Sequence, residues 1–182
     1  GMALSDGRAY QVAESLADGV GPRSSGSDGA ARAVTWAVAE MRALGLKNVH
    51  TEPVRVPHWI RGAAEAEVIA PARQLLRLTA LGPSVPTGPG GITAEVVEVA
   101  SYDELKRLGD GARGKIVLFN PPAMQRGRSS FEEYVRLQAF RNGGAVAAAK
   151  AGGLAALVRS AGTGAYRLPH TGFTVFEEGK PK

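Results

Sequence analysis

Two short apolar runs with a helix-length segment between them most constrain what this chain can fold into. Residues 115–119 and 154–158 are too short for helices, and the first run is rich in β-branched side chains. Residues 131–151 supply the dozen or more positions that a crossover between parallel neighbouring strands requires. We therefore expect a βαβ unit with two buried parallel strands, within a mixed α/β fold.

Two helices are expected before this unit. Residues 8–18 have the apolar pattern of a short helix, and in residues 30–44 apolar side chains recur every three or four positions. Ser27 or Asp28 is suited to cap the longer helix, and Gly45 is suited to end it.

An extended strand and a domain boundary are expected next. Residues 46–56 alternate between apolar and polar side chains, which predicts a strand. At about residue 60 the pattern changes from helices to short strands, so we place a boundary between residues 1–59 and residues 60–182. The second domain is then expected to hold strands at 65–70, 75–81 and 92–99.

Capping boxes predict where two helices of the second domain begin. Ser101 and the glutamate three residues later form one capping box, and Ser130 with Glu133 forms another at the start of the crossover helix. Gly143 and Gly144 lie inside that helix, where each glycine costs about 1 kcal/mol relative to alanine, so they are candidates for a kink.

The net charge of +5 is concentrated in the last third of the chain. Residues 1–120 hold 13 basic and 13 acidic side chains, whereas residues 121–182 hold 9 basic and 4 acidic ones. This imbalance favours an acidic partner. The basic side chains are spaced out with few aromatics between them, which disfavours nucleic-acid binding and also fits a merely solvated basic face. They are Arg126, Arg128, Arg136, Arg141, Lys150, Arg159 and Arg167.

The chain offers little for catalysis or metal binding. Cysteine is absent, and the three histidines, His50, His58 and His170, match no local ligand motif. No Gly-x-Ser-x-Gly elbow follows a strand. The glutamate pairs at 132–133 and 177–178 have no histidine or aspartate partners at ligand spacing. We therefore assign no catalytic residue, no metal ligand and no cofactor to this chain.

Other site types are also disfavoured. Residues 26–29 (GSDG) open a helix but follow another helix and carry Asp28, so capping is favoured over anion binding. No run of 18 apolar residues is present, which predicts no membrane span. The first 20 residues lack the layout of an export signal, although Gly1 before Met2 is typical of a scar left by tag removal.

Several motifs together resemble a known family. Residues 21–29 (GPRSSGSDG), 41–46 (MRALGL) and 54–59 (VRVPHW) resemble the lead-in of the zinc exopeptidases of metallopeptidase family 28, in its carboxypeptidase Q (plasma glutamate carboxypeptidase) branch. Residues 114–118 (GKIVL), 143–153, 157–160 (LVRS) and 169–172 (PHTG) are similar to the protease-associated domain inserted in those enzymes. Single motifs are weak, but their order is fairly specific and the likeness covers nearly the whole chain.

The resemblance implies a division of labour. In that family a catalytic α/β domain, most of which follows the insertion, holds two zinc ions through His, Asp and Glu residues, and no such position matches in this chain. Residues 1–59 would then be a helical segment that packs on the peptidase domain in cis, and residues 60–182 the protease-associated domain, which borders the active-site cleft and affects substrate access. The resemblance also implies a secreted or periplasmic protein whose leader has been removed.

Candidate interface residues follow from the same resemblance. Arg159, Tyr166, Arg167, His170 and Thr171 are expected to face the catalytic half or its peptide substrate, since a proline-stiffened loop loses little entropy on contact. The alternative is that His170 and Thr171 only satisfy backbone groups of a tight turn.

A second hypothesis from a different class remains open. The chain could be a self-sufficient protein-interaction module that binds an acidic partner through its basic last third. The two hypotheses differ over the helix face with Val34, Ala37 and Met41. An interaction module would bury this face internally, whereas a peptidase segment would leave it uncovered or packed on another copy in a homo-oligomer.

Overall fold

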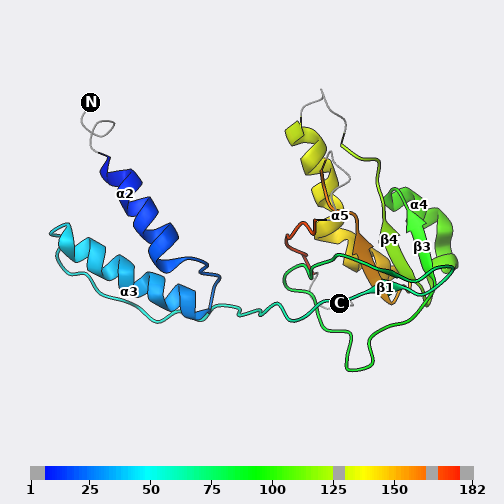
Figure 1. The fold of residues 1–182 in the computed structure, drawn as a ribbon, viewed down its shortest axis with the longest axis horizontal. Helices are drawn as coiled ribbons and strands as arrows, with labels where there is room; N and C mark the ends of the chain where they lie inside the picture. The colour runs from blue at the N-terminus through cyan, green and yellow to red at the C-terminus, as the bar shows by residue number, and fades with distance from the viewer. Residues whose placement is uncertain (1–6, 125–129, 163–167, 177–182) are drawn as a thin grey trace. The chain divides into compact units, whose positions relative to one another are not determined.

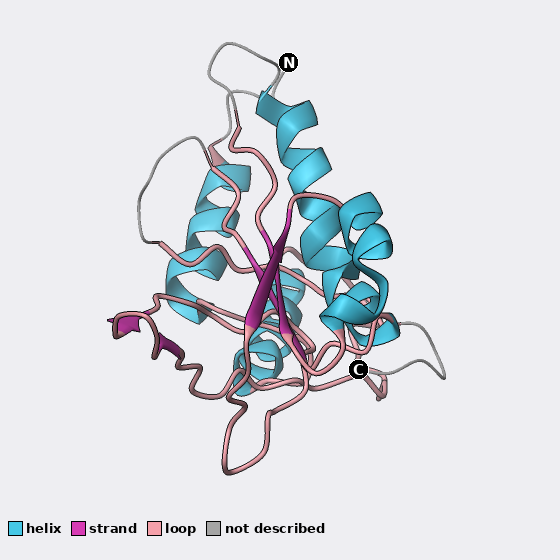
Figure 2. Cartoon of the chain, turned by 90° about the vertical axis from the view of Figure 1, so that its right-hand side faces the viewer, coloured by secondary structure: helices cyan, strands magenta, loops and turns pink. Residues whose placement is uncertain are grey.

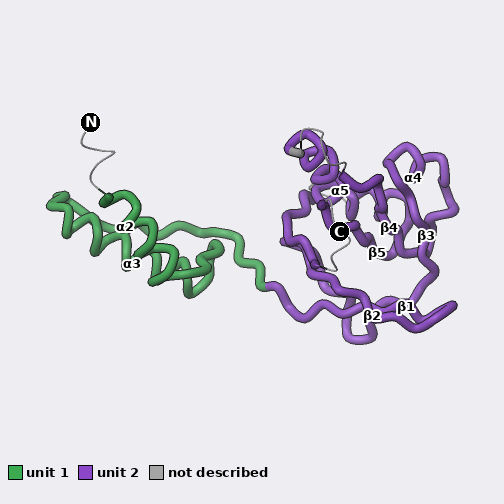
Figure 3. Tube along the Cα trace, turned by 45° about the horizontal axis from the view of Figure 1, so that its top comes forward, with its two compact units in different colours: residues 1–60 green, residues 61–182 purple. Residues whose placement is uncertain are grey.

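The computed structural model describes residues 7–124, 130–162 and 168–176, and they form two compact units. The first unit comprises Gly1–Ile60 and the second Arg61–Lys182 (Figure 3). Each unit is described by itself below.

The first unit is helical. It contains α2 (Arg8–Glu14), a π-helical segment η1 (Ser15–Val20) and α3 (Asp28–Ala43) (Figure 1). Ser27 caps α3, since its Oγ accepts a hydrogen bond from the N–H of Ala30 at 3.2 Å. Gly45, at a φ of 79°, ends the helix in a Schellman motif, in which Leu46 N–H donates to the Met41 carbonyl at 3.1 Å. Both helix ends therefore agree with the sequence-based prediction.

The strand predicted over residues 46–56 does not form a ladder. The structure assigns no strand between α3 and residue 67. A strand is stabilised by hydrogen bonds to a neighbour, and no described residue of the first unit pairs with this segment. The predicted strand over residues 46–56 is therefore wrong, because alternation of side chains does not by itself supply a neighbouring strand.

The second unit is built around a parallel sheet. The strands β3 (Val96–Val99), β4 (Ile116–Phe119) and β5 (Ala155–Val158) lie in the order β3-β4-β5, with Val117 paired to Val97 and to Ala156. The crossover helix α5 (Ser130–Lys150) joins β4 to β5 (Figure 1). The predicted βαβ unit and the mixed α/β class are confirmed.

The core of the second unit lies between the sheet and two helices. Val117 and Phe119 of β4 are fully buried. The Phe119 ring lies 5.7 Å from both Tyr102 of α4 (Tyr102–Leu108) and Phe140 of α5, measured between ring centroids. Both helices therefore pack on the sheet face that carries Phe119.

The two glycines of α5 allow this close packing. A Cβ on Gly144 would lie 3.1 Å from the Phe119 ring, and one on Gly143 would lie 3.0 Å from the Tyr102 hydroxyl. The helix continues without a break through both positions, so the glycines do not divide it. The glycines serve contact between helix and sheet, and the helix tolerates their cost in propensity because that packing is gained.

The start of α4 agrees with the predicted capping box. Ser101 Oγ accepts from the N–H of Glu104 at 3.1 Å, and the Glu104 carboxylate accepts from Ala100 N–H at 2.6 Å. A short 3₁₀ segment, η2 (Gly109–Ala112), follows. The side chain of Ser130 lies outside the described residues, so the second capping box stays a prediction.

The remaining strands are shorter than predicted. The ladder of β1 (Glu67–Val68) and β2 (Gln74–Leu75) is antiparallel and pairs two residues of each strand. The predicted range 65–70 was therefore too long, and the range 75–81 overlaps β2 only at Leu75. Apolar content alone overestimated their length, because the exposed ribbon has no second layer to pack against. Figure 2 shows how short all the strands are relative to the loops.

Candidate functional site

The candidate interface residues follow the carboxyl end of β5. Arg159 continues this strand, since its N–H donates to the Phe119 carbonyl at 3.0 Å. His170 and Thr171 lie on the segment of residues 168–176, which returns to the same region. Tyr166 and Arg167 lie outside the described residues.

The hydroxyl of Ser160 ties this returning segment to the end of β5. Ser160 Oγ donates to the Leu168 carbonyl at 3.0 Å and accepts from the N–H of His170 at 3.2 Å. His170 Nδ1 lies 3.3 Å from the Ala161 carbonyl. The backbone of His170 is therefore fixed by one side chain, and its ring is held over the chain that leaves β5.

Arg141 of α5 holds the segment from the opposite side. Its guanidinium donates through Nη1 to the Thr171 carbonyl at 3.0 Å and through Nη2 to the Tyr134 hydroxyl at 2.7 Å. The guanidinium carbon also lies 5.0 Å from the centre of the Tyr134 ring, which stands 5.7 Å from the His170 ring. Arg141 is only 5% exposed, and its Nε has no hydrogen-bond partner among the described residues. The site thus contains a buried cation that is held by neutral groups.

The point at which the chain enters the second unit is fixed to the segment of residues 168–176. Arg61, its first residue, donates through Nη2 to Thr171 Oγ1 at 2.6 Å and through Nε to the Ala80 carbonyl at 3.0 Å. The N–H of Gly82 donates to the Gly172 carbonyl at 3.1 Å, and the N–H of Thr174 donates back to Gly82. Residues 110 positions apart in the sequence therefore lie side by side.

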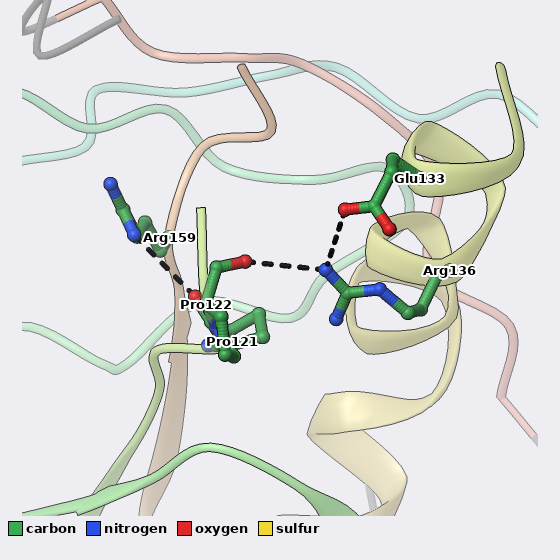
Figure 4. A network of polar contacts seen from close by, with 5 residues as sticks. All are labelled: Pro121, Pro122, Glu133, Arg136 and Arg159. Carbon is green, nitrogen blue, oxygen red and sulfur yellow. Dashed lines mark hydrogen bonds and ion pairs between the residues drawn. The ribbon is translucent and has the colours of Figure 1, made fainter. Parts of the chain in front are cut away.

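A shallow hollow lies at the carboxyl edge of the sheet, next to the segment of residues 168–176. We call it the carboxyl-edge hollow; its lining is Pro121, Pro122, Ala123, Leu137, Arg159, Ser160 and Gly162. Two arginines reach its proline pair from opposite sides (Figure 4). Arg159 Nη1 donates to the Pro121 carbonyl at 3.4 Å, and Arg136 Nη2 donates to the Pro122 carbonyl at 3.3 Å and to Glu133 Oε2 at 3.1 Å.

The described residues do not supply a zinc site. No group of three His, Asp or Glu side chains converges anywhere in the described part of the chain. His50 is exposed, and hydrogen bonds to the Asn48 carbonyl and then to the Glu52 carboxylate raise its pKa. His58 lies against Gly26, where a Cβ would come within 2.8 Å of the His58 Cβ. The residues in hand therefore do not fit a two-zinc centre.

Residues 26–29 serve the helix rather than an anion. Ser27 uses its hydroxyl as the cap of α3, and a Cβ on Gly29 would lie 2.0 Å from the Pro22 carbonyl oxygen. Gly26 has a φ of 75°. Close approach and a left-handed backbone account for both glycines.

The contacts of Arg61, Tyr134 and Arg141 were not predicted from the sequence. Arg141 was counted on a solvated basic face, and this interpretation is wrong for it because the side chain is buried. Its burial could have been inferred from its spacing to apolar residues along α5. Arg141 stands four residues after Leu137 and seven before Ala148, both of them buried on the inward stripe of α5.

The chain is similar in sequence to known peptidases. No protein-family model matches the chain. Carboxypeptidase Q of Bos taurus is 42% identical over 175 residues, which are 96% of this chain and 35% of that protein. The chain therefore spans about a third of the length of the curated relatives that it matches.

Two solved structures are similar. The crystal structure of a peptidase M28 precursor from Shewanella amazonensis superposes with a TM-score of 0.83 at 37% identity and covers 97% of this chain and 40% of that one. BSAP, a zinc aminopeptidase from Bacillus subtilis, has a TM-score of 0.53 at 20% identity and covers 82% of this chain and 32% of that one, so it supports the fold alone.

Proposed function

The chain corresponds to one part of a carboxypeptidase Q-like peptidase of family M28, and on this premise we propose that it is the part without the catalytic chemistry. The first unit would pack on the peptidase domain in cis. The second unit would act as the protease-associated domain and modulate substrate access or protein contacts.

Uncovered apolar side chains on the first unit carry this proposal. Val34, Met41 and Leu44 of α3 are 51%, 41% and 47% exposed. Val20 is the only apolar side chain that is buried among the described residues of this unit. A helix that leaves its apolar stripe in water normally has a partner for it. A self-sufficient interaction module would have buried this face.

A contact between distant segments is compatible with a role of the second unit as a domain of its own. Arg61, where the chain enters the second unit, is hydrogen-bonded to Thr171, so the entry point is fixed against the segment of residues 168–176.

We further propose that the segment of residues 168–176 faces the peptidase domain or its peptide substrate, together with Arg159. Ser160 and Arg141 fix this segment on both sides, so the exposed parts of His170 and Thr171 would be presented with little loss of entropy. Tyr166 and Arg167 belong to the same proposed surface.

The proposal assigns zinc to the peptidase domain. Two zinc ions would be held there, where they supply Lewis-acid chemistry for hydrolysis. We also propose a secreted or periplasmic location. No helix in the described part of the chain is long and apolar enough to cross a bilayer.

Complementation tests this assignment. A carboxypeptidase Q-like peptidase from which the matching segment has been deleted would be co-expressed with this chain, and hydrolysis of a dipeptide measured. The chain alone is expected to hydrolyse nothing, with or without zinc, and the pair to regain activity. Val34→Asp should abolish the gain, because it places a charge in the proposed contact.

Val85→Asp is the matched control, since Val85 lies in the second unit and is 49% exposed. It should leave the regained activity unchanged. Chelator-sensitive hydrolysis by the chain alone would overturn the proposal, as would regained activity that is indifferent to Val34→Asp.

A further inference from the structure

The carboxyl-edge hollow combines apolar side chains with a cation that no described carboxylate neutralises. Pro121 and Pro122 have no backbone N–H, and the two guanidinium groups already occupy their carbonyls. Leu137, 6% exposed, lies among the residues that line the hollow. Pro121 and Leu137 are buried, so the apolar surface exposed here comes from Pro122 and Ala123, and the polar groups stand at its rim.

Of the two arginines at the rim, Arg159 has the charge that is less offset by neighbouring groups. Its side chain makes one polar contact among the described residues, at 3.4 Å to a neutral carbonyl, and no described carboxylate lies within ion-pair distance. A contact of that length is a weak hydrogen bond. Arg136 donates to Glu133, whose carboxylate offsets part of its charge.

The backbone that carries these groups is well fixed. Arg159 extends the ladder between β4 and β5 through its N–H, and the neighbouring Ser160 is locked by two hydrogen bonds. A ligand would therefore meet a preorganised stretch of backbone that carries two exposed arginines, Arg136 and Arg159.

We propose that the carboxyl-edge hollow binds an extended acidic peptide segment. One of its carboxylates pairs with Arg159, a second lies toward Arg136, and the chain between them crosses the exposed Pro122. A peptide suits this surface because the two cations reach the proline pair from opposite sides (Figure 4). The described lining residues include no aromatic side chain on which a base could stack, which disfavours a nucleic acid.

This inference deepens the proposed function. It rests on the proposal that the second unit lies beside a peptide. Its test measures binding to the chain as it stands and involves no hydrolysis. Failure of the complementation experiment and failure of the binding experiment can therefore be told apart.

The test uses fluorescence anisotropy with a fluorescein-labelled tetraglutamate peptide, and with tetraglutamine as the uncharged comparison. Tetraglutamate should bind, and its affinity should fall with added salt. Arg159→Gln should weaken binding about tenfold, as expected for loss of one charge-assisted hydrogen bond. Arg136→Gln should weaken it less, and Arg159→Lys, which keeps the charge, should lose less than Arg159→Gln.

Arg107→Gln is the matched control. Arg107 is an exposed arginine of α4, and the substitution makes the same change in net charge away from the hollow. Binding should change less than about twofold, because at long range only screened interactions are lost. Amidation of the peptide's carboxyl end removes the terminal carboxylate. Unchanged binding would mean that side-chain carboxylates make the contact, and weaker binding would mean that the terminal carboxylate contributes; both results support the proposal.

Three results would overturn the inference. The first is equal binding of tetraglutamate and tetraglutamine. The second is an equal loss on Arg107→Gln and Arg159→Gln, which would indicate a diffuse charge effect. The third is equal or tighter binding of an oligothymidylate of the same charge. Circular dichroism of each variant confirms that the fold is retained.

Discussion

Gly144→Ala in α5 tests whether helix propensity or packing decides at the contact between helix and sheet. Alanine is about 1 kcal/mol better than glycine inside a helix. The new Cβ, however, would lie 3.1 Å from the ring of Phe119, which is fully buried against Tyr102 and Phe140. Extra atoms in a packed core typically cost about 1 to 3 kcal/mol. The net expectation is a loss of about 1 kcal/mol in the free energy of unfolding, which combines the two ranges.

Gly143→Ala is the matched control, because it makes the same change in propensity one residue earlier. Its Cβ would lie 3.0 Å from the Tyr102 hydroxyl, at the far end of a partly exposed side chain. That hydroxyl donates to the Ala139 carbonyl at 2.8 Å, and moving it would cost about 0.5 to 1.5 kcal/mol. The gain in propensity of about 1 kcal/mol should roughly cancel this cost, so stability should change little.

Urea denaturation followed by far-UV circular dichroism measures both variants. Tryptophan fluorescence is unsuitable because both tryptophans, Trp36 and Trp59, lie in the first unit. Phe119→Leu would relieve the crowding, so Gly144→Ala should cost less in that background than in the wild type. Stabilisation by Gly144→Ala in the wild-type background would refute the reasoning, since it would mean that the ring moves aside freely.

Three further outcomes are expected. Ser27→Ala should destabilise the first unit by about 1 kcal/mol through loss of the α3 cap, and tryptophan fluorescence during urea unfolding checks this; no change would contradict the cap. Burial raises the pKa of Tyr102, so spectrophotometric titration should find one tyrosine that ionises above pH 10. The folded state then retains this proton longer than the unfolded one, so stability should fall as the pH rises through that pKa; Tyr102→Phe should remove this part of the loss. Arg73→Gln should raise the pKa of Glu67 toward its ordinary value, because the hydrogen bond from Arg73 keeps it low, and NMR titration of the carboxyl carbon would show an unchanged pKa if the pair does not form in solution.

Local patterns in the sequence predicted what local physics determines. The caps at Ser27 and Ser101 and the glycine stop at residue 45 depend on groups within a few residues of one another. The βαβ unit was also predictable, because the length between residues 119 and 155 leaves a helical crossover as the ordinary solution.

Features that depend on distant partners could not be predicted in this way. Residues 46–56 have a strand pattern, but a strand needs a neighbour, and the neighbour is not encoded in the alternation itself. Arg141 stands on an inward stripe, yet its burial depends on residue 171, 30 positions away. Arg61 pairs with Thr171 across 110 positions. The side chains that fix the segment of residues 168–176, Ser160 and Arg141, were not predicted.

The two units differ in how far their own residues account for their stability. In the second unit β4 is buried between β3 and β5 and beneath two helices, and its aromatic cluster satisfies the usual requirement for a core. The first unit has well-formed helix ends but buries a single apolar side chain among its described residues. Caps and propensity stabilise isolated helices only marginally, and most helical stability comes from packing of an apolar face. α3 therefore has a well-formed cap but an exposed apolar face at Val34 and Met41. Both features are explained if this face packs on a surface outside this chain.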